Sequence, residues 1–523
     1  MGPALAVSAA APKAGIVLVA LAAACVLVNR APRRRCAWMG LALVLAAVIL
    51  IDHISDTDQW HSLTDSGARF AALCVLALLV VTLLGSIFVR RPEALPVVVV
   101  AVLPFRVPIE AAGTTSNLLV PLYLVIAGGC AAFAWRTLHD RASPADGDPA
   151  RPLTLALAVF LVLYASQALY SKDFDTALEQ VVFFFVPFAL LFVLLREVQW
   201  TRQMVLACLG VLVALAVVFC AIGFWEYQRR ELFWNPKVIA ANQFESYFRV
   251  NSVFWDPNVY GRFLALVMTA VAAFLLWTRR PATALVAGAG LAVLWGGLVL
   301  TFSQSSFAAL LAGLAVLAAL RWDVRRTAAV AVAGVALAAV IAVAFQDTLK
   351  IELGSTSGLT EVTSGRSDLI GGGLELFANR PVQGYGSGAF GRAYRQERKG
   401  NQQQAVSASH TMPVTVAAEQ GLIGLAAYLA VVAAGLLTLF GDRAAARARV
   451  PETADGGPRV ARAALAAMFV ALLVHTMVYA AFLEDPFTWV ILAAGMSLAP
   501  MAQLGLVLRP APVRRTQPVP AAT

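Results

Sequence analysis

The chain has 523 residues, of which 60% are hydrophobic and only 13% are charged, and its mean hydropathy is +0.76. A soluble globular protein carries about twice that charged fraction, so the composition excludes one. The net charge of +10 would suggest a nucleic-acid partner in a soluble protein, but most of the basic residues here lie in short loops between apolar runs. No basic stripe interleaved with aromatic residues occurs, so we expect no nucleic acid.

Apolar runs recur along the whole chain, and each is close to the ~20 residues that a membrane-spanning helix needs. They predict an all-α fold, a polytopic transmembrane helical bundle of about 14 or 15 spans and of roughly 12 at the least. The first run follows only Lys13 and ends before Asn29 without a clear cleavage site, so we expect a retained span. Five of the six Cys lie in apolar runs and Cys36 lies in a basic loop, so we expect no disulfide framework.

Basic loops give the expected orientation, because cytoplasmic loops carry an excess of Lys and Arg. Arg-rich segments fall at 33–35, 90–91, 136–151, 196–202, 279–280, 321–326 and 443–462. With these segments in the cytoplasm, the N-terminus and the segments at 225–261 and 346–412 face outside.

The same alternation gives a division of the chain. We expect an N-terminal transmembrane bundle (1–290) with an external loop at 225–261, a region at 291–440 with a large external loop at 346–412, C-terminal transmembrane helices (441–508) and a disordered cytoplasmic tail (509–523). Residues 94–135 contain Pro104, Pro108 and Pro121 and form either two kinked spans or a re-entrant pair.

The external segment at 225–261 is dense in groups that contact sugars and phosphates. It holds Arg249, Asp256 and Asn258, and Arg262 follows directly. Amides bond sugar hydroxyls, and the Arg fork matches phosphate oxygens. An interfacial belt of Trp and Tyr with Arg anchors is the alternative, but a belt does not need Asp256, Asn258 and Arg262 together. We therefore expect these four residues to bind substrate.

The large loop at 346–412 is polar, Gly-rich and Arg-rich, which favours an anionic substrate on that side. Arg366 precedes a Ser-Asp pair, which predicts the start of a short amphipathic helix that ends near Arg380. Gly384, Gly386 and Gly388 follow without a preceding strand, so they are no dinucleotide-binding fingerprint and we expect a flexible turn. The basic residues at 392–399 are typical of a solvated face.

Two ionisable residues accompany the start of the next span. His410 lies just before it, where an imidazole can accept a proton from a sugar hydroxyl; an interfacial His without function is the alternative. Glu419 lies about two and a half turns deeper. A carboxylate within a span is expensive and indicates a functional site, and a hydrogen bond that braces neighbouring helices is the alternative.

A polar junction, Ser303-Gln304-Ser305, occupies the outer end of an earlier span, and alone it indicates nothing more. The external loops hold no carboxylate pair with metal-ligand spacing. We therefore expect no metal ion and no other cofactor.

Taken in order, these segments resemble the O-antigen ligase and polymerase superfamily of bacterial envelope glycosyltransferases. The resemblance covers residues 291–440, and the order of its elements is more specific than any one of them. The elements are Ser303-Gln304-Ser305, Gly365-Arg366, Asn379-Arg380-Pro381, Gly384-Tyr385-Gly386-Ser387-Gly388, and His410 ahead of Ala418-Glu419-Gln420-Gly421.

The resemblance implies an enzyme that takes a glycan from an undecaprenyl-diphosphate carrier and attaches it to a lipid or glycan acceptor at the outer face of the bacterial plasma membrane. It implies that Arg366 binds the carrier diphosphate, that His410 acts on the acceptor hydroxyl and that no metal is required. We expect Gln304, Arg380 and Glu419 to contribute to substrate binding. The expected partners are the lipid-linked glycan, the acceptor and membrane lipids, and attack opposite the diphosphate would invert the anomeric centre.

Two positions depart from the family's pattern. The junction often reads Ser-Arg in the family, and Gln304 stands where that Arg would be, so a second diphosphate-binding Arg is missing from its usual place. Arg262 or Arg249 would be the substitute. Thr411 follows His410 where Asn is frequent.

Alternative functions remain open. A ligase uses a different molecule as acceptor and a polymerase uses a second lipid-linked repeat, and the sequence does not separate them. A polytopic transporter is the rival class, but transporters often show inverted repeats and midplane charges, whereas the polar residues here concentrate at one face. A non-catalytic protein that binds the lipid carrier is a weaker alternative.

Overall fold

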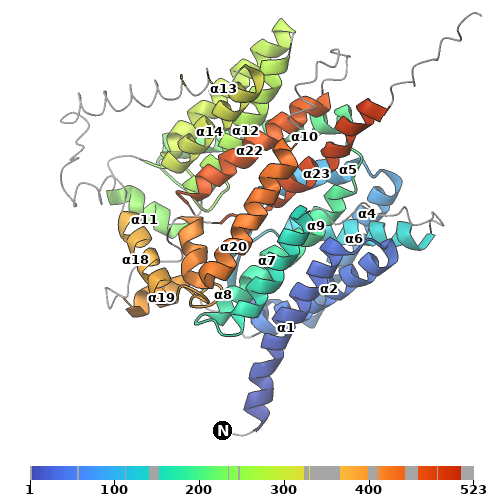
Figure 1. Ribbon diagram of the computed structural model, residues 1–523, viewed down its shortest axis with the longest axis vertical. Helices are drawn as coiled ribbons and strands as arrows, with labels where there is room; N and C mark the ends of the chain where they lie inside the picture. Colours follow the sequence, from blue (N-terminus) through green and yellow to red (C-terminus); the bar gives the residue numbers. More distant parts are fainter. Residues whose placement is uncertain are drawn as a thin grey trace, which may run out of the picture.

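The computed structural model describes the chain except for residues 1–2, 56–57, 112–113, 140–151, 234, 245–247, 279, 323–324, 326–328, 330–365, 398–408, 410, 442–456, 480 and 508–523. Helices dominate the described part, as Figure 1 shows. The one addition there is an antiparallel hairpin of β1 (Val107–Ala111) and β2 (Thr114–Leu118). The prediction of an all-α, polytopic fold is confirmed.

Nine helical stretches of the described residues are long and apolar enough to cross a membrane. They are α2 (Pro32–Ile54), α4 (Gly67–Arg90), α6 (Val120–His139), the continuous run of α8 (Phe174–Glu179), η1 (Gln180–Phe185) and α9 (Val186–Arg196), α10 (Arg202–Arg229), α12 (Pro257–Trp277), α13 (Pro281–Thr301), α14 (Gln304–Arg321) and α20 (Met412–Phe440). Four shorter apolar stretches lie in α1 (Pro3–Val28), α7 (Pro152–Ala168), α22 (Gly457–Thr476) and α23 (Pro486–Val507). The chain is therefore a multi-pass membrane protein.

Shorter helices connect the spans. They are α3 (Asp58–Thr64), α5 (Ala94–Val102), α11 (Pro236–Phe244), α18 (Arg366–Asn379) and α19 (Phe390–Glu397). Of the alternatives for residues 94–135, two kinked spans do not form. The nine residues of α5 rise only about 14 Å, less than half of a bilayer core, and the hairpin follows before α6 begins.

The helices form two groups, which α20 and α23 join (Figure 1). One group packs α1 with α2, α7 and α9, and α4 with α6; the other packs α12 with α13, α14 and α22. The run that ends in α9 and the helix α12 are mostly buried, whereas α4 exposes most of its apolar side chains, as a lipid-facing helix does. Because α12 packs on α14 and α22, this contact crosses the predicted division at residue 290.

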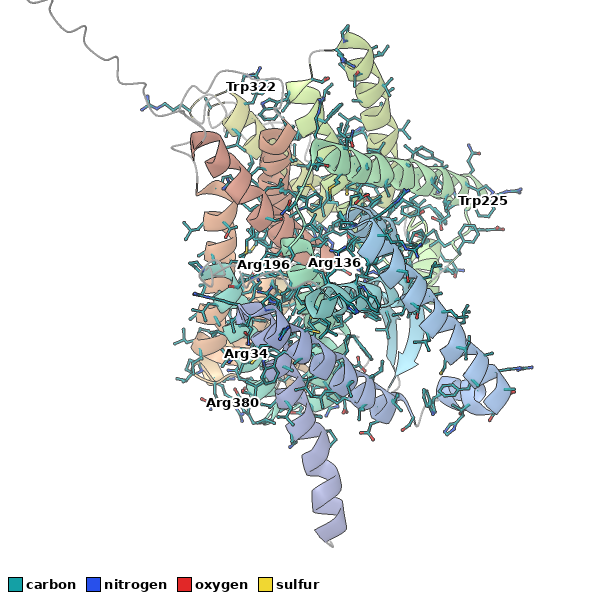
Figure 2. All side chains as sticks on the ribbon, turned by 90° about the vertical axis from the view of Figure 1, so that its right-hand side faces the viewer. Arg34, Arg136, Arg196, Trp225, Trp322 and Arg380 are labelled. Atoms are coloured by element: carbon teal, nitrogen blue, oxygen red, sulfur yellow. The ribbon has the colours of Figure 1, made fainter. Side chains whose placement is uncertain are left out.

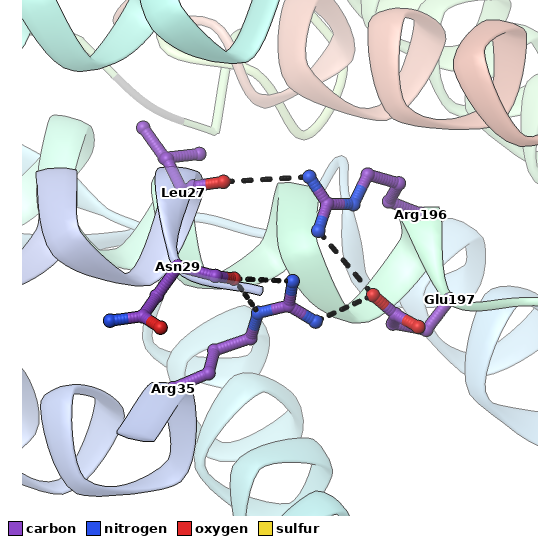
Figure 3. Close-up of polar contacts among 5 residues, drawn as sticks. All are labelled: Leu27, Asn29, Arg35, Arg196 and Glu197. Atoms are coloured by element: carbon purple, nitrogen blue, oxygen red, sulfur yellow. Dashed lines mark hydrogen bonds and ion pairs between the residues drawn. The ribbon is translucent and has the colours of Figure 1, made fainter. Parts of the chain in front are cut away.

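Arginines predicted to face the cytoplasm bind the end of α1. Arg35 donates to the Asn29 carbonyl at 2.7 and 3.1 Å and pairs with Glu197 at 2.7 Å, and Arg196 donates to the Leu27 carbonyl at 3.4 Å (Figure 3). The last carbonyls of a helix lack intrahelical partners and carry partial negative charge. The two arginines therefore stabilise this helix end.

The same arrangement recurs at the ends of α4 and α20. Arg136, labelled in Figure 2, donates to the Phe88 carbonyl, and Arg462 donates to the carbonyls of Thr438 and Leu439 at 3.0 and 3.2 Å. These arginines thus have a structural role in addition to their predicted role in the orientation.

Candidate functional site

Arg262 and Asp485 form a buried ion pair between α12 and the start of α23. Arg262 Nη2 lies 2.7 Å from Asp485 Oδ2, and the two side chains are only 4% and 3% exposed. Arg262 Nη1 also donates to the Ala481 carbonyl at 3.2 Å. Buried charges cost several kcal/mol each unless they are paired, so the pair fixes the 481–485 connection against α12.

A small cavity borders this ion pair, and we call it the Arg262 cavity. Its lining consists of Leu103, Pro104, Arg106, Phe254, Val259, Arg262, Phe263, Asp485, Pro486 and Phe487. Two of the three charged side chains are arginines, and the other lining residues are apolar. This combination suits an anionic group that is joined to an apolar one.

Asp256 and Asp485 occupy equivalent positions, each before a proline at the start of a helix. Asp256 Oδ1 accepts a hydrogen bond from the backbone N–H of Asn258 at 2.6 Å, and Asp485 Oδ1 accepts from that of Phe487 at 2.8 Å. An Asp before Pro is a favourable helix start. Asp256 also bonds the hydroxyl of Tyr479, and burial raises the pKa of Tyr479 above its ordinary value, so the hydroxyl keeps the proton that it donates.

Arg249 ties the external segment to the serine-rich junction. Its Nε donates to the Thr301 carbonyl at 2.9 Å, and its Nη2 donates to Asn258 Oδ1 at 3.1 Å. The Asn242 side chain holds the backbone N–H and carbonyl of Arg249 at 3.1 and 3.0 Å. Arg249 and Asn258 therefore lie together beside the junction, in which Gln304 is exposed.

The junction itself begins α14 and connects it to α22. Ser303 Oγ accepts from the backbone N–H of Ser306 at 3.4 Å, which caps the helix. Ser305 Oγ lies 3.2 Å from Nε2 of the buried His475. Both serines thus have structural partners, whereas the Gln304 side chain between them faces outward.

Glu419, inside α20, binds two backbone donors. Its Oε2 accepts from the N–H of Gly388 at 3.0 Å and its Oε1 accepts from the N–H of Phe390 at 3.1 Å. The carboxylate is buried and joins α20 to the start of α19. These contacts favour the bracing role that the sequence left open, and its predicted role in substrate binding stays a prediction.

The glycine run before α19 is a tightly packed turn, which differs from the flexible one expected. Gly384, Gly386 and Gly388 have φ angles of 65°, 96° and 72°, which favour glycine. A Cβ on Gly386 would lie 2.3 Å from Cα of Ser171 in the α7–α8 turn. The close approach of another backbone therefore requires glycine here.

The helix α20 is interrupted where the other side of this turn packs against it. Gly421 has a φ of 64°, and the helix is interrupted there. The Ala418 and Glu419 carbonyls accept from the N–H groups of Tyr385 and Gly386 at 3.2 and 2.8 Å. A helix break at membrane depth requires such substitute partners, so the turn and α20 form one unit.

Arg380 directly follows α18 and contacts an aromatic ring. Its guanidinium is 4.6 Å from the ring centre of Tyr385, and the ammonium of Lys172 is 4.8 Å from the same ring. Figure 2 shows Arg380 and Trp225, which begins the external segment at 225–261, on separate parts of the molecule. Arg249 has other partners, the Thr301 carbonyl and the Asn258 side chain.

The two residues predicted to be catalytic fall at the edges of the described part. Arg366 is the first residue of α18, and its side chain and all of His410 lie outside the described residues. Thr411, which follows His410 in the chain, donates from Oγ1 to the Met477 carbonyl at 3.0 Å. Met477 belongs to the α22–α23 connection, whose other end holds Arg262.

The region from α13 to α20 matches a known family: residues 289–429 fit the model of the family described as O-antigen ligase. Over these residues the chain is similar to the O-antigen ligase family. The match confirms the resemblance drawn from the sequence. It includes α14, α18, α19 and the first half of α20, whereas the residues that line the Arg262 cavity lie before and after it. No curated protein matches the chain.

Sequence reasoning missed three residues that lie outside the matched region: Arg106, Tyr479 and Asp485. One signal was present, because Asp485 precedes a proline at the start of an apolar run in the same way as Asp256 does. In the described residues no group of three or more His, Cys, Asp or Glu could hold a metal ion, and the expected lack of a metal stays a prediction.

Proposed function

We propose that the chain is a membrane glycosyltransferase that moves a glycan from an undecaprenyl-diphosphate carrier to an acceptor hydroxyl at the outer face of the bacterial plasma membrane. The observation that carries this proposal is the O-antigen ligase match over residues 289–429. The multi-pass helical fold supports it, because both the carrier and the site then share the membrane interface.

The Arg262 cavity supports an anionic, lipid-linked donor. It adjoins the first turns of α12 and α23, and the ends of spanning helices lie near the interface. A carrier diphosphate also stays at the interface while its polyprenyl chain stays in the hydrocarbon. The arginine side chains suit the phosphate oxygens, and the apolar walls suit the adjoining lipid.

The proposed reaction gives the candidate residues three roles: binding the diphosphate, contacting the sugar or the acceptor, and accepting a proton. Arg262 and Arg366 bind the diphosphate, while Arg249, Asp256, Asn258, Gln304 and Arg380 are candidates for contacts with sugar or acceptor. His410 takes the proton of the acceptor hydroxyl, whose oxygen attacks the anomeric carbon from the side opposite the diphosphate. The bond from that carbon to the diphosphate oxygen breaks, and undecaprenyl diphosphate leaves with the electron pair, so the centre inverts.

Thr411 supports this arrangement, because it bonds Met477 in the connection that also holds Arg262 through Ala481 and Asp485. The 477–485 connection therefore contacts both the proposed donor site, through Arg262, and the residue that follows the proposed base. The leaving diphosphate needs stabilising positive charge more than a general acid, and arginines supply that charge.

The test is transfer by the purified full-length protein in liposomes with a purified undecaprenyl-diphosphate-linked glycan. One arm contains a separate lipid or glycan acceptor, and the other contains the donor alone. A product that forms only with the separate acceptor supports a ligase, and longer lipid-linked chains from the donor alone support a polymerase. Movement of unchanged donor across the bilayer without a new glycosidic bond would overturn the proposal in favour of transport.

A further inference from the structure

The Arg262 cavity contains a second arginine, which the roles above do not use. Arg106 lies between α5 and β1, in the first quarter of the chain, whereas Asp485 lies near its end; both line the cavity. Its Nε is buried, and no hydrogen-bond acceptor among the described residues contacts that atom. The carboxylate of Asp485, which also lines the cavity, already pairs with Arg262.

The carboxylate of Asp485 therefore has to serve both arginines of the cavity. Burial lowers the pKa of Arg106, the neighbouring Arg262 acts in the same direction, and Asp485 opposes the shift. A guanidinium nevertheless keeps its proton in a protein, so the positive charge remains in the cavity wall. An anion in the cavity would compensate it.

The two arginines differ in what a ligand would displace. Arg262 donates to Asp485 and to the Ala481 carbonyl, so a phosphate has to compete with both. Arg106 Nε has no such bond to lose. The cavity measures about 10 Å³, roughly the room that one water molecule needs. A larger anion can therefore bind only if side chains of the lining move. On binding, the anion would give Arg106 Nε the acceptor that it lacks.

We propose that Arg106 is a diphosphate-binding residue that acts with Arg262, and that it supplies the second guanidinium that the serine-rich junction lacks at Gln304. Each guanidinium fork matches the oxygens of one phosphate. The apolar side chains that make up the rest of the lining favour a diphosphate joined to a lipid over a free inorganic one. This inference rests on the proposed function, because the donor assigned there is a lipid-linked diphosphate.

The test compares the binding of undecaprenyl diphosphate with that of undecaprenyl phosphate to the purified full-length protein in nanodiscs. The variants are Arg106→Gln, Arg106→Lys and, as a matched control, Arg202→Gln, an exposed arginine at the start of α10. We expect Arg106→Gln to weaken diphosphate binding by roughly 10- to 100-fold, the size of a lost charge-assisted hydrogen bond. Monophosphate binding changes much less, so the preference for diphosphate collapses.

Arg106→Lys keeps the charge without the fork, so it should show an intermediate preference, and Arg202→Gln should match the wild type. Both affinities are measured on one preparation, so a reduced yield of folded protein does not alter their ratio, and the Lys variant carries the same test if Gln is poorly tolerated.

An unchanged preference for diphosphate in both Arg106 variants would overturn the role of Arg106 and leave the proposed function standing. A wild-type protein that binds no undecaprenyl diphosphate would overturn the proposed function itself. Inorganic diphosphate that binds the wild type as tightly as the lipid-linked form would overturn the lipid-linked ligand.

Discussion

Asp485 holds Arg262 with one carboxylate oxygen and caps α23 with the other. Oδ2 lies 2.7 Å from Arg262 Nη2, and Oδ1 accepts from the N–H of Phe487 at 2.8 Å. The direction of the guanidinium therefore depends on where α23 begins. A single side chain thus connects the start of α23 to the charged wall of the Arg262 cavity.

Asp485→Asn should keep the hydrogen bond that caps α23 and remove the negative charge that pairs with Arg262. The amide oxygen can still accept from Phe487, but Arg262 is left as a buried charge without its counter-ion. Removing one partner of a buried pair costs about 3–5 kcal/mol, so we expect the free energy of unfolding to fall by that order and glycan transfer to be lost. Denaturant titration in detergent and the liposome assay measure the two effects.

The double variant Arg262→Gln/Asp485→Asn is the control for this pair. It removes both charges, so most of the lost stability should return, whereas transfer should stay absent because no guanidinium remains at that position. Transfer that recovers together with stability would contradict a substrate-binding role for Arg262.

Gly386→Ala and Gly371→Ala should have opposite effects. At Gly386 the φ of 96° is unfavourable for Ala, and the new Cβ would lie 2.3 Å from Cα of Ser171, so we expect destabilisation by more than about 2 kcal/mol. Gly371 is helical with nothing within 4 Å of its Cβ position, so Ala should stabilise α18 by about 0.5–1 kcal/mol. Limited proteolysis between α18 and α20 compares them, and equal cleavage of both variants would argue against the tight packing of this turn.

The sequence was sufficient to predict the helices but not the contacts of the glycine run. Apolar runs of spanning length identify a transmembrane helix because the bilayer alone demands them. The glycine requirement at Gly384 and Gly386 arises instead from Glu419 and Ser171, whose backbones approach from α20 and from the α7–α8 turn. No local pattern contains that information.

The same reason explains which site residues were found. Arg262 stands out because it shares one short segment with Asp256 and Asn258, and this segment is dense in groups that contact sugars and phosphates. Arg106 and Asp485 lie near opposite ends of the chain, and each alone is an ordinary interfacial charge. Only the packing of α5, α12 and α23 places them in one cavity.

Arg366→Lys and Arg366→Ala test the proposed grip on the diphosphate. Lys keeps the charge but loses the bidentate fork, and Ala loses both, so we expect both to impair transfer and Ala to impair it more, with an unchanged amount of protein in the membrane. Arg395→Ala, an exposed arginine of α19, is the matched control and should transfer at the wild-type rate. Wild-type transfer by Arg366→Ala would remove Arg366 from the proposed site.

The orientation gives a further prediction. Because Arg-rich loops favour the cytoplasm, a reporter fused after Arg34 or after Arg325 should be active only as a cytoplasmic enzyme, and one fused after Gly400 only as an external one. The three fusions control for one another in expression. A cytoplasmic signal after Gly400 would reverse the orientation and place the proposed site on the wrong side for an external acceptor.

His410→Ala should abolish most transfer and leave donor binding intact. The acceptor hydroxyl is a poor nucleophile, so a base contributes roughly 10²- to 10⁴-fold, whereas the diphosphate is held by arginines that this substitution does not touch. We therefore expect wild-type affinity for undecaprenyl diphosphate together with a transfer rate lower by that factor. The exposed His139 provides the matched control, and His139→Ala should transfer at the wild-type rate. His475 is unsuitable as a control because it contacts Ser305 inside the bundle.

The wild-type and variant rates are also measured with and without a chelator, which should change neither rate. If His410→Ala transferred at the wild-type rate, or if the chelator stopped the wild-type reaction, the metal-independent mechanism with a His base would be wrong, even with the similarity to the O-antigen ligase family unchanged.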